Sequence, residues 1–218
     1  MNAKLHEGVW LPGGEAHLIE MMSPGAKRFA RLPDGRASYQ RHKYLAALDL
    51  VRARQVFVDI GAHVGLWSMQ AEFDFAEITA FEPHPVHADL YRHNVGRGVL
   101  HEVALGDAEA AVSLTSSPTS SGDTWVSGTG DIPMRTLDGF GLERIDLLKI
   151  DTEGYELPIL RGAAETLRRC RPVVVVEQKG RDARYHGGRD GEALDLLREM
   201  GAVPLRAPIS GDHFMGWV

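Results

Sequence analysis

The sequence predicts an α/β fold built on a mostly parallel sheet with helices on both faces. Short apolar runs rich in β-branched residues recur along the chain, and such runs are typical of strands buried on both faces. Each of the clearest runs is followed by a glycine turn or an acidic residue and then by helical spacing; they cover 56–60, 78–81, 146–150 and 173–176. Strand and helix alternating with short links predict parallel pairing with right-handed crossovers.

The composition limits the classes of function. The 218 residues leave room for one domain with a full core. Lys plus Arg is 24 and Asp plus Glu is 30, so the net charge of −6 argues against a general nucleic-acid binder. The single cysteine, Cys170, cannot form an internal disulfide, and no apolar run is long enough to span a bilayer. With no signal peptide visible in the first 30 residues, we expect a cytoplasmic protein without a membrane partner.

The N-terminal residues 1–54 are expected to be an extension with turns and a helix, in the same domain as residues 55–218. Glycines and prolines are dense in 1–38, which predicts short strands and turns. Apolar residues at helical spacing predict a helix over 39–53. The segment 27–54 holds eight Lys or Arg and two acids, which indicates either a solvated face or a basic rim that attracts an anionic substrate.

The segment 56–68 holds the most informative motif of the sequence, a strand followed by a glycine turn and a helix. A strand over 56–60 carries Asp59 near its end, and Gly61 then allows a sharp turn. Gly65 allows the next helix to start close against the strand. Glu82 ends the second apolar run, 21 residues after Gly61, where an acid can bind the two hydroxyls of a nucleoside ribose. The alternative for Asp59 is a strand-end carboxylate that only caps the following helix.

The middle of the chain continues the alternation. We expect a helix over 66–75, a strand over 78–81, a helix over 86–95 and a strand over 99–105. Residues 113–130 then break the pattern, since thirteen of these 18 are Ser, Thr or Gly. This segment is interpreted as a surface excursion, or alternatively as a lid with Trp125 as an apolar cover.

The second half of the chain returns to regular elements. A strand over 146–150 ends at Asp151, and a strand over 173–176 ends at Glu177. Between them we expect one helix, whose buried face carries Leu157, Leu160, Ala164 and Leu167. A helix over 190–200 and a last strand over 214–218 complete the chain.

These motifs carry a resemblance to a known family. The matching segments are Phe57–Ala62, Phe81–Pro83, Ala104–Asp107, Thr136–Asp138, Leu148–Glu156 and Arg171–Pro172. In this order they resemble the FkbM-type methyltransferases, a branch of the S-adenosylmethionine-dependent enzymes. The resemblance covers roughly residues 55–180, and the segment Lys-Ile-Asp-x-Glu-Gly-x-Glu from Lys149 is its most diagnostic part.

The resemblance implies a Rossmann-like class I methyltransferase fold, with seven mostly parallel strands and the last strand antiparallel. It implies S-adenosylmethionine as the cofactor and methyl transfer to a hydroxyl of a sugar or small metabolite. It also implies a set of cofactor contacts, from the methionine end through the ribose to the adenine: Asp59, Gly61, Ala62, Gly65, Glu82, Pro83, Leu105, Gly106 and Asp107.

A neutral hydroxyl is a poor nucleophile, so O-methylation benefits from a general base. Asp151 at a strand tip is the first candidate, and His186 in a later loop is the second. Glu153 could be a base, a substrate clamp or a metal ligand, or could only complement a helix dipole. The substrate candidates are Tyr155, Glu177 and Lys179, although Glu177 and Lys179 could equally form a structural ion pair.

The histidines show no tight metal-ligand spacing, so no metal site is assigned. The pair His84 and His87 is interpreted as capping or surface residues at a helix start. A nicotinamide dehydrogenase would need Gly-x-Gly-x-x-Gly after the first strand, and this chain has Gly61-x-x-x-Gly65. A methyltransferase acting on nucleic acid or protein, or a non-catalytic nucleoside-binding module, remains an alternative.

Overall fold

The computed structural model describes residues 2–116, 121–181 and 188–218, and its centre is a seven-stranded sheet in the order β14-β15-β13-β12-β5-β6-β7. Neighbouring strands run parallel except at β15, which is antiparallel to both β13 and β14. This confirms a mostly parallel sheet whose last strand is antiparallel. The strands are β5 (Val56–Ile60), β6 (Glu77–Phe81), β7 (Val99–His101), β12 (Leu147–Ile150), β13 (Val173–Glu177), β14 (Val203–Pro204) and β15 (Asp212–Gly216).

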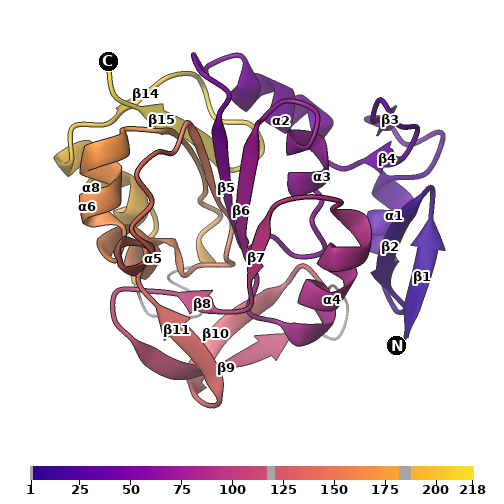
Figure 1. Cartoon of the computed structure of the whole chain (residues 1–218), viewed down its shortest axis with the longest axis horizontal. Helices are drawn as coiled ribbons and strands as arrows, with labels where there is room; N and C mark the ends of the chain where they lie inside the picture. The colour runs from indigo at the N-terminus through magenta and orange to yellow at the C-terminus, as the bar shows by residue number, and fades with distance from the viewer. Residues whose placement is uncertain (1, 117–120, 182–187) are drawn as a thin grey trace.

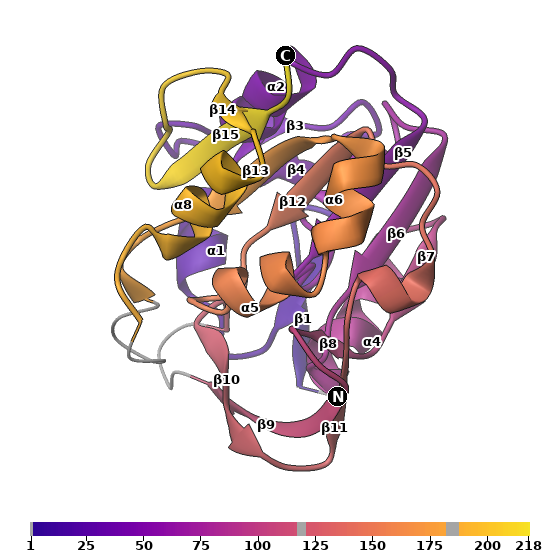
Figure 2. The ribbon, with the colours of Figure 1, turned by 90° about the vertical axis from the view of Figure 1, so that its left-hand side faces the viewer.

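Helices cover both faces of this sheet (Figure 1). One face carries α2 (Arg41–Leu48), α3 (Ser68–Ala71) and α4 (Pro85–Asn94), and the other carries α5 (Glu156–Arg161), α6 (Ala164–Cys170) and α8 (Glu192–Glu199). Figure 2 shows the second group in front of the strands. Alternate residues of β5 face the two layers, because Phe57 packs with Tyr44 of α2 and Val58 packs with Leu160 of α5.

The residues before β5 form short elements, as the density of glycine and proline predicts. Val9 and Leu11 are fully buried and pack in one cluster with Leu90 of α4. The helix expected over 39–53 forms over the shorter span of α2. The other elements are β1 (Ala3–His6), β2 (Val9–Pro12), α1 (His17–Met21), β3 (Ala30–Arg31) and β4 (Ala37–Ser38).

A second sheet of four strands lies at one end of the first, at the bottom of Figure 1. The prediction of a single strand over 99–105 is wrong, because β6 ends at Phe81 and offers β7 no partner beyond His101. The described part of 113–130 contributes an antiparallel hairpin whose residues are mostly exposed or half-buried, so the segment lies at the surface as expected but is regular in structure. The sheet has the order β10-β9-β11-β8, with β8 (Ala104–Leu105), β9 (Ala110–Ser116), β10 (Thr124–Thr129) and β11 (Ile132–Arg135).

Two further predicted helices are shorter than expected or interrupted. The helix over 66–75 is regular only in α3, with turns on either side. The helix after Tyr155 is broken into α5 and α6 at Gly162, whose carbonyl accepts the N–H of Asp138, at the start of the 3₁₀ turn η1 (Asp138–Phe140). A Cβ atom at Gly162 would lie 1.9 Å from the carbonyl oxygen of Gly106. The break at Gly162 therefore lets the backbone between α5 and α6 pack directly against the backbone at Gly106.

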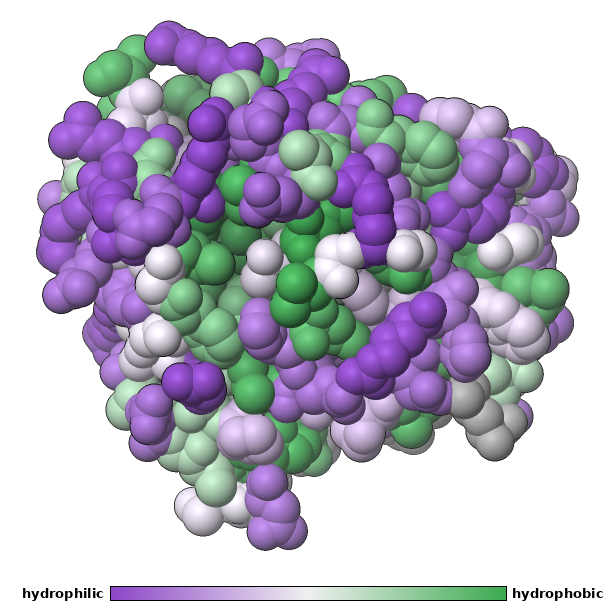
Figure 3. All heavy atoms as spheres, viewed as in Figure 1, coloured by the Kyte–Doolittle hydropathy of each residue, from purple (hydrophilic) through white to green (hydrophobic). Residues whose placement is uncertain are grey.

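The outside of the molecule is mainly polar. The face seen in Figure 3 is largely hydrophilic, with hydrophobic residues showing near its middle. In the described ranges, no helix combines the length and the apolar character that crossing a membrane requires. Exposed large apolar side chains come from separate elements, as with Leu5, Phe73 and Val99, which is normal for a folded domain.

A buried ion pair connects α2 to the last strand. Lys43 Nζ lies 2.7 Å from Asp212 Oδ1, with side-chain exposures of 4% and 7%. Because Lys43→Met would leave Asp212 buried without its cation, we expect the free energy of unfolding to fall by about 3 kcal/mol in urea denaturation. The control is Arg54→Met. Because the Arg54 side chain is 47% exposed, this variant should lose less than about 1 kcal/mol of unfolding free energy. Equal losses in the two variants would contradict a structural role for the buried pair.

Candidate active site

The carboxyl ends of β5 and β12 meet where the strand order reverses. From β5 the chain moves to β6 on one side and later returns to β12 on the other side. This arrangement opens a crevice at the strand ends, where open α/β sheets bind ligands. Gly61 lets the chain after β5 lie directly against the chain after β12. Its φ is 72°, and a Cβ atom there would lie 2.0 Å from the carbonyl oxygen of Asp151.

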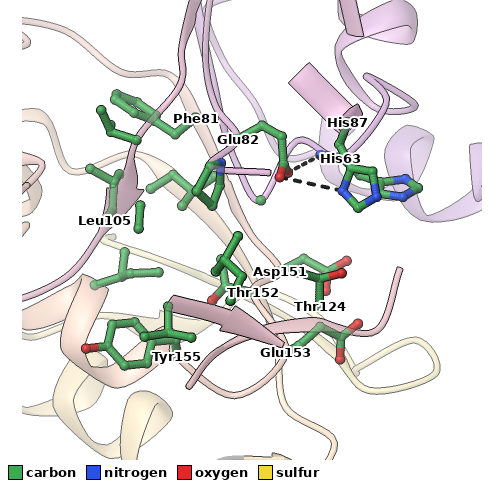
Figure 4. A pocket seen from close by; sticks show the side chains of 18 of the residues that line it. His63, Phe81, Glu82, His87, Leu105, Thr124, Asp151, Thr152, Glu153 and Tyr155 are labelled. Atoms are coloured by element: carbon green, nitrogen blue, oxygen red, sulfur yellow. Dashed lines mark hydrogen bonds and ion pairs between the residues drawn. The ribbon is translucent and has the colours of Figure 1, made fainter. Parts of the chain in front are cut away.

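Glu82 follows β6 and is held rigidly at one wall of the crevice. Its Oε2 accepts the backbone N–H of His63 at 2.8 Å, and its Oε1 accepts that of His84 at 2.8 Å. His87 Nδ1 lies 3.6 Å from Oε1, as the dashed line in Figure 4 marks. Because each carboxylate oxygen can accept two hydrogen bonds, Glu82 keeps acceptor capacity for hydroxyl groups of a ligand.

A cavity of about 580 Å³ lies beside Glu82, and we call it the inner cavity. Figure 4 shows Glu82 and His87 on one side of it, with Leu105 and Tyr155 on others. Leu114 and Val126 of the hairpin β9–β10 help to close it. A mainly apolar cavity with one fixed carboxylate is typical of a small-molecule site. Further apolar lining comes from Ile60, Phe81, Val103 and Ile159.

A second cavity of about 1140 Å³, the outer cavity, continues from the first. The two share several lining residues, including Gly61, His63, Asp151 and Glu153. The wall of the outer cavity is more polar than that of the inner one, although Leu18, Leu66 and Trp67 also line it. It is formed mainly by Tyr39, Gln40, Lys149, Glu177, Lys179 and Arg181.

A buried lysine supports the floor of the crevice. Lys149 Nζ donates to the carbonyl oxygen of Gly61 at 2.8 Å and lies 3.3 Å from Asp59 Oδ1 and 3.8 Å from Asp151 Oδ2. Burial lowers the pKa of Lys149, but the two carboxylates outweigh burial and the net pKa is raised. Asp59 has no exposed surface, and its Oδ2 also accepts the hydroxyl of Ser68 at 2.8 Å.

Three carboxylates gather above this lysine. One oxygen of each of Asp151, Glu153 and Glu177 lies within 4.8 Å of the others, a spacing that could also hold a metal ion. Arg181 contacts both Glu153 and Glu177, and Lys179 contacts Glu177, so cationic side chains already neutralise part of this charge. Burial raises the pKa of Asp151, but Lys149 and more distant cations outweigh burial and the net pKa is lowered.

The predicted cofactor residues separate into two groups. Gly61, Glu82, Pro83 and Leu105 line the inner cavity, and Ala62 lines the outer cavity. The remaining four are not among the described lining residues of either cavity: Asp59 lies beneath the floor on Lys149, Gly65 against Tyr91 and Val95, Gly106 against Met134, and Asp107 on the exposed surface. The arrangement of Asp59 therefore agrees with a structural carboxylate more than with a ligand contact.

The predicted catalytic and substrate residues are also divided. Asp151 and Glu153 line both cavities, while Glu177 and Lys179 line only the outer one. Tyr155 lies at the inner cavity, away from the other substrate candidates. His186 lies outside the described residues.

Some site residues carry no local signal in the sequence. Tyr39 and Gln40 reach the outer cavity from the N-terminal extension, while the basic residues of 27–54 are missing from the described lining of both cavities. Gln40 has a φ of 53°, a backbone strain that often marks a functional position.

His87 is buried, with its ring 4.3 Å from that of His63, so its interpretation as a surface residue is wrong.

Comparison with known proteins decides the family. The family model described as the Methyltransferase FkbM domain matches residues 59–204. The chain belongs to this family. Membership confirms the resemblance seen in the sequence and supports S-adenosylmethionine as the cofactor. The match begins at Asp59, so Tyr39 and Gln40 precede the family domain.

Two curated relatives illustrate the range of the family. The chain is 31% identical over 167 residues to "Methyltransferase sdnD" of Sordaria araneosa, covering 55% of this chain and 64% of that protein. It is 27% identical over 138 residues to "Hexuronic acid methyltransferase AglP" of Haloferax volcanii, covering 58% of this chain and 57% of that protein. The chain thus matches less than two thirds of the length of each of these proteins.

The fold is shared with more distant methyltransferases. The crystal structure of precorrin-6y C5,15-methyltransferase from Geobacter metallireducens superposes with a TM-score of 0.51 at 16% identity, covering 88% of this chain and 94% of that one. This likeness concerns the fold alone, and it confirms the class I methyltransferase architecture predicted from the sequence.

The Lys149–Asp59 pair gives a prediction about stability. In Lys149→Met the fully buried Asp59 loses its cation, so we expect the free energy of unfolding to fall by about 3 kcal/mol or more in urea denaturation. Adding Asp59→Asn removes the uncompensated charge and should restore at least half of this loss. A double variant no more stable than Lys149→Met would contradict the pairing.

Proposed function

We propose that this chain transfers a methyl group from S-adenosylmethionine to a hydroxyl of a small polar acceptor, with a saccharide as the first class to test. The observation that carries the proposal is the pair of adjoining cavities that differ in polarity. The inner cavity is apolar with a fixed carboxylate, and the outer cavity is rich in charged side chains. They share Gly61, His63 and Asp151, so a cofactor in one and an acceptor in the other would meet there.

The residues of the inner cavity suit the nucleoside end of the cofactor. Glu82, oriented by two backbone N–H groups, would accept hydrogen bonds from the ribose hydroxyls. Phe81 and Leu105 offer apolar surface for the adenine ring, and the turn at Gly61 and Ala62 borders the place for the methionine end. Bound there, S-adenosylmethionine would supply a methyl group already activated on a sulfonium, and the protein must align the acceptor and exclude water.

The residues of the outer cavity suit an acceptor rich in hydroxyl groups. Asp151 and Glu153 accept hydrogen bonds, while Lys179 and Arg181 donate them, and a sugar needs both kinds of partner. The name of the relative AglP, a hexuronic acid methyltransferase, supports a saccharide acceptor. A nucleic-acid acceptor is disfavoured, because the described lining of the outer cavity has four carboxylates against three cationic side chains, Lys149, Lys179 and Arg181.

An acceptor screen tests the function directly. Release of S-adenosylhomocysteine is measured with neutral sugars, uronic acids, small phenols and oligonucleotides as separate pools. We expect turnover with a hydroxylated small molecule and none with oligonucleotides. Calorimetry with S-adenosylmethionine and with NAD provides the companion measurement, and binding of NAD alone would contradict the proposal.

Replacing Glu82 should weaken cofactor binding. Glu82→Gln keeps the shape but exchanges one acceptor oxygen for a donor, so a hydrogen bond either to the backbone or to the ribose is lost. A hydrogen bond to a charged group contributes roughly 1.5–3 kcal/mol, so the Kd for S-adenosylmethionine in calorimetry should rise about tenfold or more. The control is Glu77→Gln at the exposed start of the same strand, which should leave the Kd unchanged.

The residue Tyr39 should affect only the acceptor. It lines the outer cavity and not the inner one, so Tyr39→Ala should raise the KM for the acceptor found in the screen about tenfold. The Kd for S-adenosylmethionine should stay within a factor of two. Leu5→Ala, an exposed change in the same N-terminal extension, is the control. An unchanged acceptor KM in Tyr39→Ala would remove this residue from the acceptor site.

A further inference from the structure

Three titratable side chains line both cavities in the described structure: His63, Asp151 and Glu153. Two of them are paired with cations. Asp151 lies 3.8 Å from the ammonium of Lys149, and Glu153 contacts the guanidinium of Arg181. A cation beside a carboxylate lowers its affinity for a proton. The ring of His63 makes its hydrogen bond to a neutral hydroxyl instead.

A chain of hydrogen bonds fixes the tautomer of this ring. Glu15, just before α1, is 4% exposed, and its Oε2 accepts both the backbone N–H and the hydroxyl of Ser121. Burial raises the pKa of Glu15, but the hydrogen bonds from Ser121 and Leu18 outweigh burial and the net pKa is lowered, so this carboxylate only accepts. Because the hydroxyl proton of Ser121 goes to Glu15, its Oγ accepts the proton of His63 Nε2 at 3.0 Å. The lone pair of the ring is therefore on Nδ1.

The backbone of His63 is held as firmly as its ring. Its N–H donates to Glu82 Oε2 at 2.8 Å, and its φ of 52° lies in a region that few residues other than glycine adopt. Such strained positions cluster at active sites. Within the described ranges, no group of the protein hydrogen-bonds to Nδ1 of His63. The carboxylate that would bind the ribose thus also fixes the place of the imidazole.

We propose that His63 is the general base that takes the proton of the acceptor hydroxyl through Nδ1, and that Glu15 acts through Ser121 as the residue that positions the ring. This assignment rests on the proposed function and replaces Asp151 as the candidate base. His63 borders both cavities, so it lies where a cofactor in one and an acceptor in the other would meet. A carboxylate behind a histidine also orients the base of hydrolase triads, and here a hydroxyl lies between the two.

The proton balance is simple. As the acceptor oxygen bonds to the methyl carbon, the bond from that carbon to sulfur breaks and its electron pair remains on sulfur. The hydroxyl proton passes to Nδ1 of His63, which becomes an imidazolium. The products are a methyl ether and a neutral thioether, and the ring later returns the proton to solvent.

The surroundings keep the ring neutral before the reaction. Burial first, and then the proximity of His87 and Lys149, hold the pKa of His63 well below its usual value. The ring therefore has its lone pair available at pH 7. The imidazolium formed during the transfer is stabilised by the ionised Glu15 through Ser121. Besides Glu15, the titratable groups that face the ring are Glu82, His84, His87 and Lys149.

Replacing the ring tests the base directly. His63→Asn introduces a residue that tolerates a positive φ but takes no proton near pH 7, so kcat with the acceptor found in the screen should fall about 100-fold or more. The Kd for S-adenosylmethionine in calorimetry should stay within about threefold. His93→Asn, an exposed change in α4, is the control and should keep kcat. A wild-type kcat in His63→Asn would overturn the proposal.

Chemical rescue separates a proton acceptor from a structural ring. His63→Gly adopts the same φ without strain and leaves the space of the ring empty, so added imidazole should raise its kcat about tenfold or more. The increase should follow the imidazole concentration, and the wild-type protein should not respond. A folded His63→Gly that stays inactive at every imidazole concentration would overturn the assignment of the base.

The positioning role of Glu15 and Ser121 has its own test. Ser121→Ala removes the bridge and should lower kcat about tenfold at an unchanged Kd for S-adenosylmethionine, whereas Ser121→Thr keeps the hydroxyl and should recover most of kcat. Equal losses of kcat in the two variants would contradict a role of the hydroxyl.

A measurement without turnover checks the tautomer. In protein labelled with ¹⁵N at histidine and free of cofactor, the signals missing from His63→Asn should show a protonated Nε2 and a bare Nδ1 at neutral pH. Ser121→Ala should give a mixture of tautomers. A proton on Nδ1 in the wild-type protein would overturn the assignment even in an active enzyme. Absence of wild-type turnover with every acceptor would defeat the proposed function and this assignment together, whereas full turnover in His63→Asn defeats this assignment alone.

Discussion

The ammonium of Lys149 is the interaction on which the site depends. It lies between the ends of β5 and β12, where it bonds to the carbonyl of Gly61 and lies between the carboxylates of Asp59 and Asp151. A buried charge is tolerated only with such partners, so the lysine and the two acids fix one another. The same contact holds the glycine turn in place and keeps Asp151 ionised. The contacts of Lys149 therefore determine both the shape of the crevice at Gly61 and the ionisation of Asp151.

The crevice offers two different environments side by side. The inner cavity offers apolar surface and one carboxylate with fixed orientation, which suits a nucleoside. The outer cavity offers paired charges, which suit a polar molecule with many hydroxyls. Its wall includes Tyr39 and Gln40, which precede the segment matched by the family model. All described residues that line the inner cavity lie within the family domain, whereas the extension adds contacts of its own to the outer cavity.

Local patterns predicted those features that depend on a single stretch of chain. Glu82 was found because an acid at the end of a buried strand must lie at the edge of the sheet, whatever the rest of the fold does. The division of 99–105 between two sheets could not be found in this way, because it depends on where β6 ends and where β11 lies. The meeting of His63 and His87 likewise requires a turn and a helix that the sequence does not bring together.

The sequence by itself determined the alternation of strands and helices, the parallel sheet, the family and the acids at the strand tips, because periodicity, glycine turns and motif spacing are local properties. Only the tertiary structure decided which acids face a ligand and which lie buried. Asp59 is the penultimate residue of β5 and Asp151 directly follows β12; in the fold, Asp59 is fully buried against Lys149 while Asp151 lines both cavities. Burial and the charge of neighbours set the chemistry of a carboxyl, and both come from residues distant in the chain.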